Sequence, residues 1–446
     1  MALSGLDIYK HLPKTNCKDC GVPTCLAFAM KVAGGQAALQ ACPHLSAQGQ
    51  AALSEASAPP QQLVKIGAGE KAVEIGQETA LFRHEDRFHR PTAVAVRVSD
   101  KLDQAALQER CRAVAAVKFE RMGKKLTVNL IAVQNDSGAA DKFTAAAKAA
   151  SAASGLPLVL VSDKAESLRA AGTALKAERP LLWAATGSAK NGAIAVAKEL
   201  ALPLCLEGSG YDGVLELSEA ARAAGLKELV LCPGRPEPAA GLEFLAQSRR
   251  AAIAKKFRPM GYPVAMWSTN PDPVQAAVEA SWYVLKYAGI VVVDLHRPEH
   301  LLGILTTRQD VYTDPQKPVQ VEPGLHKVGE PGPEAPVLVT TNFALSYYSV
   351  EPEVESARVP SYILSVNTEG TSVLTAWAAD KFNAKTITAA LKASGLESVV
   401  RHKKLVLPGL VAVLSGAVKE ESGWDVLVGP KEASGIGSFL KNQWRP

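Results

Sequence analysis

Hydrophobic and polar residues alternate along this chain in blocks. Between residues 92 and 314, short apolar runs are separated by longer segments with helical spacing of small and apolar residues. The runs are Ala93–Val98, Leu126–Val133, Leu158–Val161, Leu181–Ala184, Pro203–Leu206, Glu228–Leu231, Pro263–Trp267 and Ile290–Leu295. Strands that are buried on both faces read as continuous apolar runs, and parallel strands need a helical crossover between them. The pattern therefore predicts repeated strand–helix units.

The number of these units favours a closed barrel. The eight runs begin 22 to 35 residues apart, which matches the repeats of a (β/α)8 TIM barrel. Intervening segments such as Gln104–Phe119 and Val274–Tyr287 have the amphipathic spacing of covering helices. An open, doubly wound sheet is the alternative reading. We predict a barrel domain over residues 92–314.

The segment after the barrel predicts a linker and a further domain. Residues 315–336 hold six prolines with glycines between them, and each proline fixes its φ angle, so we expect a semi-extended linker. Residues 337–446 return to strand–helix alternation and predict a small doubly wound α/β domain. Its strand candidates are Val337–Thr341, Tyr362–Val366, Ser398–Val400, Leu410–Leu414 and Asp425–Val428.

The amino end is a separate small module. Residues 1–57 are too few to hold a strong core unaided, and modules of this size usually rely on a metal or on disulfides. Residues 58–91 are mixed and charged, and we expect them to be a connector that lies on the barrel. The predicted class is thus α/β, with a small N-terminal module, a TIM barrel and a C-terminal α/β domain.

Composition narrows the possible functions. Hydrophobic residues make up 47% of the 446 residues, and the net charge is only +5 with scattered Lys and Arg. Charge therefore gives no support for nucleic-acid binding. No apolar stretch approaches the roughly 20 residues of a membrane span. The first 13 residues lack the basic start and apolar run of a signal peptide, so we expect a cytoplasmic protein.

Four of the seven cysteines lie in the first 42 residues, at positions Cys17, Cys20, Cys25 and Cys42. An odd and uneven count without an export signal argues against a disulfide framework and favours a local metal site. Four thiolates suit either a structural zinc or an iron–sulfur cluster. Three close cysteines and a distant fourth followed by proline are more typical of a ferredoxin-like [4Fe-4S] cluster. Zinc remains the alternative.

The residues around these cysteines predict how the chain encloses the metal. Thr24 is expected to cap a helix that starts at Cys25, and Gly34-Gly35 is expected to end it. Gly21 and Pro23 break the local backbone, which lets amide groups turn toward the metal site. Leu26, Phe28 and Met30 are candidates for excluding water.

The block His11-Leu12-Pro13-Lys14-Thr15-Asn16-Cys17-Lys18-Asp19-Cys20-Gly21-Val22-Pro23-Thr24-Cys25-Leu26-Ala27-Phe28-Ala29 strongly resembles the start of the corrinoid iron–sulfur protein large subunits. That family includes the gamma subunit of the archaeal acetyl-CoA decarbonylase/synthase complex. The resemblance extends over the whole chain, with the same order of cluster module, barrel, proline-rich linker and small α/β domain.

The resemblance implies a methyl-group carrier of the reductive acetyl-CoA (Wood–Ljungdahl) pathway. In this family the large subunit pairs with a small subunit, and the two hold one corrinoid. Its Co(I) accepts a methyl group from methyltetrahydrofolate through a separate methyltransferase and passes it to CO dehydrogenase/acetyl-CoA synthase. The [4Fe-4S] cluster reactivates Co(II) with an electron from a low-potential donor such as ferredoxin. The resemblance thus implies a carrier protein rather than a free-standing catalyst.

The corrinoid is expected beyond the carboxyl ends of the last domain's strands, where ligands bind in open α/β sheets. These ends are rich in small and polar residues. The resemblance points to the same places, and the predicted contacts are Thr340, Ser346, Gly370, Thr371, Ser372, Val373, Leu374, Thr375, Ala433 and Gly435. The only histidine of residues 337–446 is His402, in a basic run, and Asp294-Leu295-His296 lacks the glycine of the histidine-ligand motif. We therefore expect cobalt without a protein histidine ligand.

Two other functions remain open. The barrel's carboxyl-end loops carry Asp100, Asn135, Asp136, Asp163, Glu207 and Asp294, and barrel enzymes place their chemistry there. A barrel methyltransferase that binds a pterin itself is therefore one alternative, and an electron-transfer or scaffold subunit without corrinoid is the other. No catalytic residue is predicted in the barrel. The three remaining cysteines, Cys111, Cys205 and Cys232, are expected to be buried structural thiols.

Overall fold

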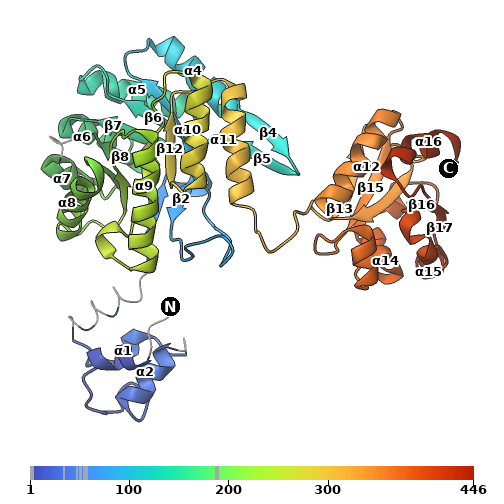
Figure 1. The fold of residues 1–446 in the computed structure, drawn as a ribbon, viewed down its shortest axis with the longest axis horizontal. Coiled ribbons are helices and arrows are strands. Elements are labelled where there is room, and N and C mark those ends of the chain that lie inside the picture. The colour runs from blue at the N-terminus through green and yellow to red at the C-terminus, as the bar shows by residue number, and fades with distance from the viewer. Residues whose placement is uncertain (1–4, 34–35, 47–48, 50–52, 54–58, 186–189) are drawn as a thin grey trace.

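The computed structural model describes residues 5–33, 36–46, 49, 53, 59–185 and 190–446, and Figure 1 shows three parts along the chain. The first part is a small helical module with α1 (Gly5–His11), α2 (Cys25–Ala33) and a short 3₁₀ helix, η1 (Leu39–Ala41). Within the described residues, no helix combines the length and apolar character that crossing a membrane requires.

The second part is built around eight parallel strands. Each of the eight apolar runs overlaps one of them: β3 (Ala93–Ser99), β6 (Leu130–Gln134), β7 (Leu158–Ser162), β8 (Leu181–Ala184), β9 (Leu204–Glu207), β10 (Leu229–Cys232), β11 (Ala265–Trp267) and β12 (Ile290–Val293). Their order in the sheet is β10-β9-β8-β7-β6-β3-β12-β11, and a parallel bridge between Leu231 and Val264 joins its two edges. The closed barrel is confirmed, and the open doubly wound alternative is wrong.

Eight helices cover the barrel on the outside, as Figure 1 shows. They are α4 (Gln104–Ala116), α5 (Ala140–Ser154), α6 (Ala165–Ala174), α7 (Lys190–Leu200), α8 (Gly210–Ala223), α9 (Pro238–Arg249), α10 (Pro273–Leu285) and α11 (Pro298–Val311). Along β3, alternate residues serve two cores, because neighbouring side chains in a strand point to opposite faces. Val94 and Val96 pack under the helices, whereas Ala93 and Ala95 fill the barrel interior.

A hairpin of the connector closes the amino end of the barrel. Its strands β1 (Leu63–Ile66) and β2 (Val73–Gly76) pair antiparallel, and Val64, Ile66 and Ile75 share one buried cluster with the barrel interior. Arg249 of α9 fastens the rest of the connector. It donates hydrogen bonds to the Ala80 and Leu81 carbonyl oxygens at 2.5 and 3.2 Å.

A second hairpin projects from the barrel between α4 and β6. It consists of β4 (Lys118–Arg121) and β5 (Lys124–Thr127), which pair antiparallel with Arg121 opposite Lys124. In Figure 1 this hairpin extends past α11 toward the third part of the chain.

The third part is a five-stranded sheet with helices on both faces. Its strands are β13 (Gly324–Val328), β14 (Val337–Thr341), β15 (Ser361–Val366), β16 (Lys404–Leu407) and β17 (Asp425–Val428), in the order β13-β15-β14-β16-β17. Only β13 runs antiparallel to its neighbour. β13 belongs to this sheet although its residues fall in the proline-rich range 315–336.

The helices of this domain form two cores, one on each face of the sheet. Val337 and Val339 pack with α13 (Val373–Ala378), α14 (Ala384–Ser394) and α15 (Ser415–Ser422). Leu338 packs on the other face with α12 (Ala344–Ala357) and α16 (Ile436–Asn442). The doubly wound domain predicted from the sequence is therefore present.

Two of the predicted strands in this domain are wrong. Ser398 is the last residue of the 3₁₀ helix η7 (Leu396–Ser398), and residues 399–400, which follow it, pair with no strand. Leu410–Leu414 lies in a 3₁₀ helix, η8 (Gly409–Leu414), where Leu410 and Val413 are exposed. A run of apolar residues forms a buried strand only where other parts of the fold cover it. In the second run, the fold leaves two residues uncovered. A further short 3₁₀ helix, η9 (Ala433–Gly435), precedes α16.

Candidate functional site

The first candidate site is the cysteine loop of the N-terminal module. As predicted, α2 begins at Cys25, and the Thr24 hydroxyl accepts a hydrogen bond from the Ala27 amide at 3.1 Å. The Asn16 side-chain oxygen accepts another from the Cys25 amide at 2.8 Å. These two bonds use amide groups that a helix start leaves without partners, and they fix the Cys17 loop against the helix.

The backbone of this loop is shaped to direct amide groups toward an anion. Lys14, Asn16 and Lys18 all have positive φ angles, so left-handed residues occupy every second position, and Gly21 follows with a φ of 73°. Backbone segments that mix right- and left-handed residues turn successive N–H groups into a concave, anion-binding surface, which many iron–sulfur sites use.

The four predicted ligands differ in burial. Cys25 and Cys42 are buried in one apolar cluster with Val22 and Phe28, and Cys20 packs against it. Cys17 is exposed, and its sulfur lies with ligand atoms of Asp19 and His44 within 4.8 Å of one another. The structure thus buries two of the thiols, leaves Cys20 half-buried and places Cys17 at the surface. Cys17, Cys20, Cys25 and Cys42 stay predicted ligands.

An ion pair borders this site. His44 Nε2 lies 2.5 Å from Asp19 Oδ2, and hydrogen bonds to His44 first, then to Cys17, hold the pKa of Asp19 below its ordinary value. Of the three residues expected to exclude water, only Phe28 is buried, whereas Leu26 and Met30 face solvent. Gly34 and Gly35, expected to end α2, lie outside the described residues.

The second candidate site is a crevice in the C-terminal domain. The strand order reverses between β14 and β16, because the chain passes from β14 to β15 on one side and then to β16 on the other. These two strands pair through Leu338 and Val406, and a cavity of about 340 Å³ lies beside them. Ligands of open α/β sheets bind at such switch points. Four predicted corrinoid contacts line the cavity: Thr340, Ser346, Val373 and Ala433.

The other predicted contacts lie on the segments that border this crevice. Gly370 and Thr371 belong to the loop after β15, Ser372 precedes α13, and Leu374 and Thr375 lie in its first turn. Gly435 ends η9. Gly370 has a φ of 73°, and a Cβ atom there would lie 2.5 Å from Gln320 Cγ. The loop therefore requires glycine at this position.

One buried side chain holds that loop. Asn342, fully buried at the end of β14, accepts hydrogen bonds through Oδ1 from the Thr368 and Gly370 amides at 2.9 and 3.1 Å. Its Nδ2 donates to Gln320 Oε1 at 3.1 Å. Asn342 was not singled out from the sequence. Its position after a predicted strand was the available signal.

The crevice has an apolar rim. Leu345 and Leu410 line the cavity, yet 63% and 42% of their surface is exposed. Leu374 and Trp377 of α13 and Val413 of η8 are exposed as well. Exposed large hydrophobic side chains that adjoin one another usually mark a binding surface, so this rim suits a broad, flat and largely apolar ligand.

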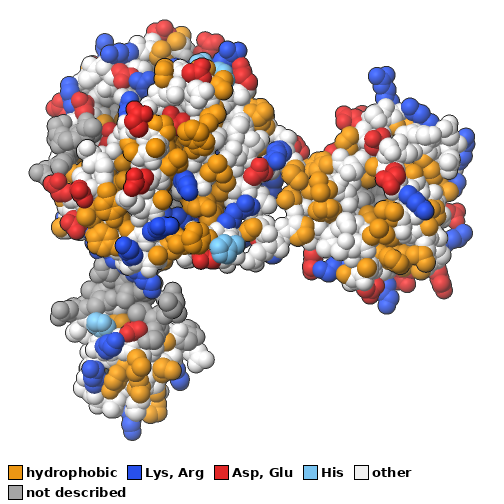
Figure 2. Space-filling view, in the orientation of Figure 1, with side chains coloured by type: hydrophobic (Ala, Val, Ile, Leu, Met, Phe, Trp, Pro, Cys, Tyr) orange, Lys and Arg blue, Asp and Glu red, His pale blue; other side chains and the backbone are white. Residues whose placement is uncertain are grey.

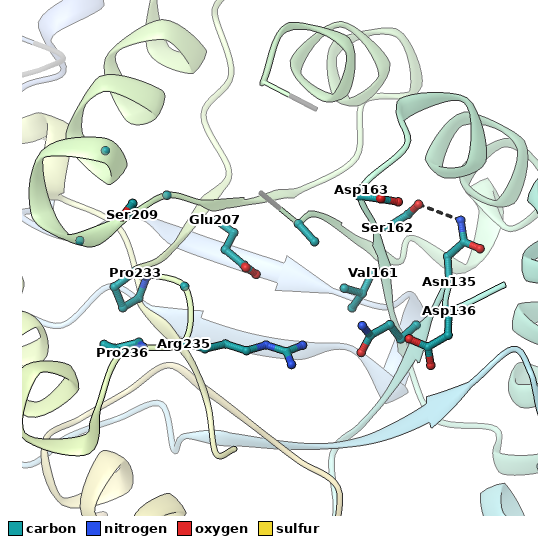
Figure 3. Close-up of a pocket in the computed structure, with 16 residues that line it drawn as sticks. Asn135, Asp136, Val161, Ser162, Asp163, Glu207, Ser209, Pro233, Arg235 and Pro236 are labelled. Carbon is teal, nitrogen blue, oxygen red and sulfur yellow. Dashed lines mark hydrogen bonds between the residues drawn. The ribbon is translucent and has the colours of Figure 1, made fainter. Parts of the chain in front are cut away.

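A third candidate site is a cavity of about 1000 Å³ at the carboxyl end of the barrel strands. Asn135, Asp136, Asp163 and Glu207 of the expected loop residues line it, as Figure 3 shows. Asp100 instead accepts hydrogen bonds from the Ser137 hydroxyl and amide, and Asp294 pairs with Arg97 and Arg110. Asp100 and Asp294 therefore have structural partners outside the cavity lining.

Glu207 projects into this cavity, as does Arg235 (Figure 3). Glu207 accepts hydrogen bonds from the indole nitrogens of Trp183 and Trp267 at 2.8 and 3.3 Å. The Arg235 guanidinium lies 4.5 Å from the centre of the Trp267 ring, a cation–π distance. Neither Arg235 nor the two tryptophans were predicted as site residues from the sequence. The only indication there was the position of Trp267 at the end of an apolar run.

Relatives match the chain along its whole length. The corrinoid/iron–sulfur protein large subunit of Moorella thermoacetica is 45% identical over 441 residues, which cover 99% of each chain. The chain belongs to this family. The acetyl-CoA decarbonylase/synthase complex subunit gamma of Archaeoglobus fulgidus is 36% identical over 465 residues, again 99% of each chain.

Two family models match complementary parts of this corrinoid/iron–sulfur family member. The model described as "CO dehydrogenase/acetyl-CoA synthase delta subunit" matches residues 63–440. The model described as "Putative Fe-S cluster" matches residues 12–44, which contain all four clustered cysteines. Among solved structures, a dihydropteroate synthase of Xanthomonas albilineans matches 57% of this chain and 100% of its own, with 18% identity and a TM-score of 0.41. That likeness is too low to assign a ligand.

The remaining cysteines and histidines of this family member lie away from both candidate sites. Cys111, Cys205 and Cys232 are fully buried, and burial raises the pKa of all three thiols, that of Cys111 to about 11. His402 precedes β16, where Nε2 lies 2.9 Å from the Ala335 carbonyl oxygen. His326 of β13 belongs to the same domain, and its Nε2 lies 2.8 Å from the Glu322 carbonyl oxygen. Neither histidine is among the described residues that line the crevice.

Proposed function

We propose that this chain is the large subunit of a corrinoid iron–sulfur protein and carries methyl groups in the acetyl-CoA pathway, in the cytoplasm. One observation supports this most: the 45% identity to such a large subunit runs through the cysteine module, the barrel and the C-terminal crevice without a break. The region predicted to bind the cluster and the region predicted to bind the corrinoid thus both align with that relative.

In this proposal Cys17, Cys20, Cys25 and Cys42 bind a [4Fe-4S] cluster. Two of the thiols are buried in an apolar cluster, and low solvent exposure is one of the factors that set the potential of such clusters. The left-handed residues of the Cys17 loop support an anionic group at this position. The match to an iron–sulfur model favours iron over zinc.

The corrinoid is proposed to lie on the crevice of the C-terminal domain. Thr340, Ser346, Val373 and Ala433 line its cavity, and the apolar rim offers a surface for the flat ring. The fixed loop at Gly370–Ser372 offers a close backbone approach beside the cavity. When bound, the cobalt of such a group accepts and donates methyl groups, and the chain supplies its position and surroundings. Since no histidine is expected at the crevice, the cobalt is proposed to have no protein ligand.

The proposed partners follow from the carrier role. They are a small subunit that completes the corrinoid site, a methyltetrahydrofolate methyltransferase, CO dehydrogenase/acetyl-CoA synthase and a ferredoxin-like electron donor. A surface for a partner exists on α10, where Val274, Val278, Trp282 and Leu285 are exposed along one face. Figure 2 shows hydrophobic side chains gathered over this helix. Exposed apolar stripes of this kind are typical of protein interfaces.

The division of labour is proposed to follow the domain order. Residues 1–57 hold the cluster and residues 58–91 connect it to the barrel at 92–314. Residues 315–336 link the barrel to the corrinoid domain at 337–446. The hairpin β1–β2 and the strand β13 show how the two connecting segments are tied to neighbouring domains.

Metal analysis tests this proposal. The full chain is produced anaerobically together with its small subunit, and iron, cobalt and zinc are measured per heterodimer. We expect about four iron atoms for one [4Fe-4S] cluster and one cobalt. Iron without cobalt would support an electron-transfer subunit instead, and zinc without iron would overturn the cluster assignment.

The barrel cavity favours one second candidate, a barrel that binds the pterin methyl donor itself. Glu207 and Arg235 project into a cavity of about 1000 Å³ at the end of the barrel where barrel enzymes bind substrates. Binding of methyltetrahydrofolate to this chain alone, and its loss in Glu207→Gln, would favour this candidate. If methyltetrahydrofolate did not bind to this chain, the carrier role would remain as the single candidate function.

A further inference from the structure

The tip of the hairpin β4–β5 has an unusual residue. Arg121 pairs with Lys124, so Met122 and Gly123 form a two-residue turn, and their φ angles are 53° and 68°. Turns with two positive φ angles strongly favour Asn, Asp or Gly at the first position. A bulky residue in this conformation is strained, and strained residues persist where the side chain has another role. The conformation of the turn therefore does not explain why methionine occupies this position, and a contact outside the hairpin is expected to explain it.

The hairpin is fixed to the barrel beside its turn as well as along its strands. Arg121 Nη1 donates hydrogen bonds to Gln309 Oε1 and Asp310 Oδ1 of α11 at 2.8 and 2.6 Å. The Gln309 amide in turn donates to the Arg121 carbonyl oxygen at 2.9 Å. Leu126 is buried in the core under the barrel helices. The tip is thus held at a defined place by its own domain.

The tip contacts the C-terminal domain. Met122 packs against the apolar cluster that α12 forms with the sheet and α16. The Tyr348 hydroxyl oxygen of α12 lies 3.4 Å from the position that a Cβ atom on Gly123 would occupy. Figure 2 shows hydrophobic side chains where this domain faces the barrel. Methionine is flexible and polarizable, which suits a contact that forms and breaks repeatedly.

We propose that the β4–β5 hairpin is a docking arm, whose Met122 packs on α12 and holds the C-terminal domain in one position against the barrel. The covalent link between the domains is the segment from residue 314 to 318, which contains Pro315 and Pro318 and no helix or strand. Beyond it, Gln320 already bridges to Phe343 and Val321 is buried in the C-terminal domain. Such a link restricts distance but does not fix orientation. The non-covalent contact at the hairpin tip supplies the fixed orientation, and its release frees the domain to turn.

Helix α12 connects the docking arm to the proposed corrinoid site. This helix carries Tyr347 and Tyr348 near the hairpin, and Ser346, which lines the crevice, is their neighbour in sequence. A corrinoid carried on this domain has to meet different partners in turn, so a weak and reversible resting contact is useful. This consequence rests on the proposed function, whereas the docking itself does not.

The substitution Met122→Asn tests the arm. Asparagine favours the left-handed conformation of this turn, so the variant removes the docking side chain while the hairpin itself is kept or strengthened. Lys124→Asn is the matched control, because it changes the same hairpin at an exposed position. Tyr348→Ser removes the contact from the opposite side. Equal thermal midpoints of the three variants and the unmodified chain would show that folding is intact.

The position of the domain is measured by single-molecule energy transfer in the full chain. Dyes are attached to encoded azide side chains at the exposed positions Lys148 on α5 and Lys392 on α14, which avoids the seven cysteines. We expect one narrow distribution for the unmodified chain and Lys124→Asn, and a broad distribution shifted to lower transfer for Met122→Asn and Tyr348→Ser. A broad distribution in the unmodified chain, or a narrow unshifted one in Met122→Asn, would overturn the docking arm. Cobalt content, measured on the same samples, reports separately on the proposed function.

Discussion

Asn342 offers a direct test of how the crevice is built. Its side chain is fully buried, and its Oδ1 accepts hydrogen bonds from the Thr368 and Gly370 amides. The substitution Asn342→Ala removes that acceptor and leaves two buried amide groups without a partner. It also ends the hydrogen bond to Gln320, so the loop that borders the proposed corrinoid surface loses its main attachment to β14.

The size of the effect follows from these bonds. A buried amide left without an acceptor costs roughly 1–3 kcal/mol. Because water enters part of the space vacated by the side chain, we expect a total near the lower end for two amides, on the order of 3 kcal/mol. At about 1.4 kcal/mol for each factor of ten, local opening of the loop becomes roughly 100-fold more frequent.

Hydrogen exchange measures this opening. Peptides that contain Thr368 and Gly370 are predicted to exchange about 100-fold faster in Asn342→Ala, and corrinoid retention by the heterodimer is predicted to fall. Asn367→Ala is the matched control, since Asn367 is exposed on the same loop and accepts hydrogen bonds from the Glu369 amide at 3.1 Å and, at a longer 3.5 Å, from Asn342 Nδ2. Unchanged exchange in Asn342→Ala, or an equal effect in the control, would refute this account of the loop.

Further predictions concern the cluster, the partner surface and acid stability. Cys25→Ser is expected to lose most of the iron measured after anaerobic purification, whereas Cys111→Ser, a buried thiol outside the module, is expected to keep it; equal loss in both would contradict the assignment. Trp282→Asp, on the exposed face of α10, is expected to weaken pairing with the small subunit at least tenfold in a co-purification or titration assay. The Lys381 ammonium holds the pKa of Glu369 below its ordinary value of 4.5. The stabilisation from this pair is therefore present above pH 4.5 and lost as the pH falls through the folded-state pKa. Lys381→Met should bring the pKa of Glu369 back toward 4.5 in an NMR titration, and an unchanged pKa would contradict the pairing.

The barrel was predictable because its strands are buried on both faces. Each strand therefore appears as an unbroken apolar run, such as Leu158–Val161, and the spacing between runs leaves room for one helix each. The C-terminal sheet was harder. β13 contains His326 and Lys327 and lies among prolines, so its five residues do not form an apolar run. β16 begins at Lys404, inside a basic run that predicts a solvated surface.

The apolar segment Leu410–Leu414 shows what sequence patterns cannot supply. Its composition favours a buried strand, but the fold leaves Leu410 and Val413 exposed beside the crevice. Uncovered apolar residues of this kind have no local signature, because exposure depends on which other segments pack nearby. The same feature makes them candidates for ligand contact.

The candidate site residues also differ in whether the sequence alone could reveal them. The four clustered cysteines could be proposed as ligands from spacing alone, since they lie close together in the sequence, between Cys17 and Cys42. Arg235 and Trp267 meet only because the barrel closes and places the loop after β10 beside the end of β11. Asn342 acts on residues that lie 26 and 28 positions later in the chain. Contacts that depend on such closure are visible only in the folded structure.

Methyl transfer onto the protein tests the central claim most directly. The heterodimer, reduced and cobalt-loaded, is incubated with isotope-labelled methyltetrahydrofolate and the methyltransferase, and the label bound to protein is compared with cobalt content. The account predicts one labelled methyl group per cobalt, released when acetyl-CoA synthase is added. Cobalt-containing protein that acquires no label under these conditions would contradict the account.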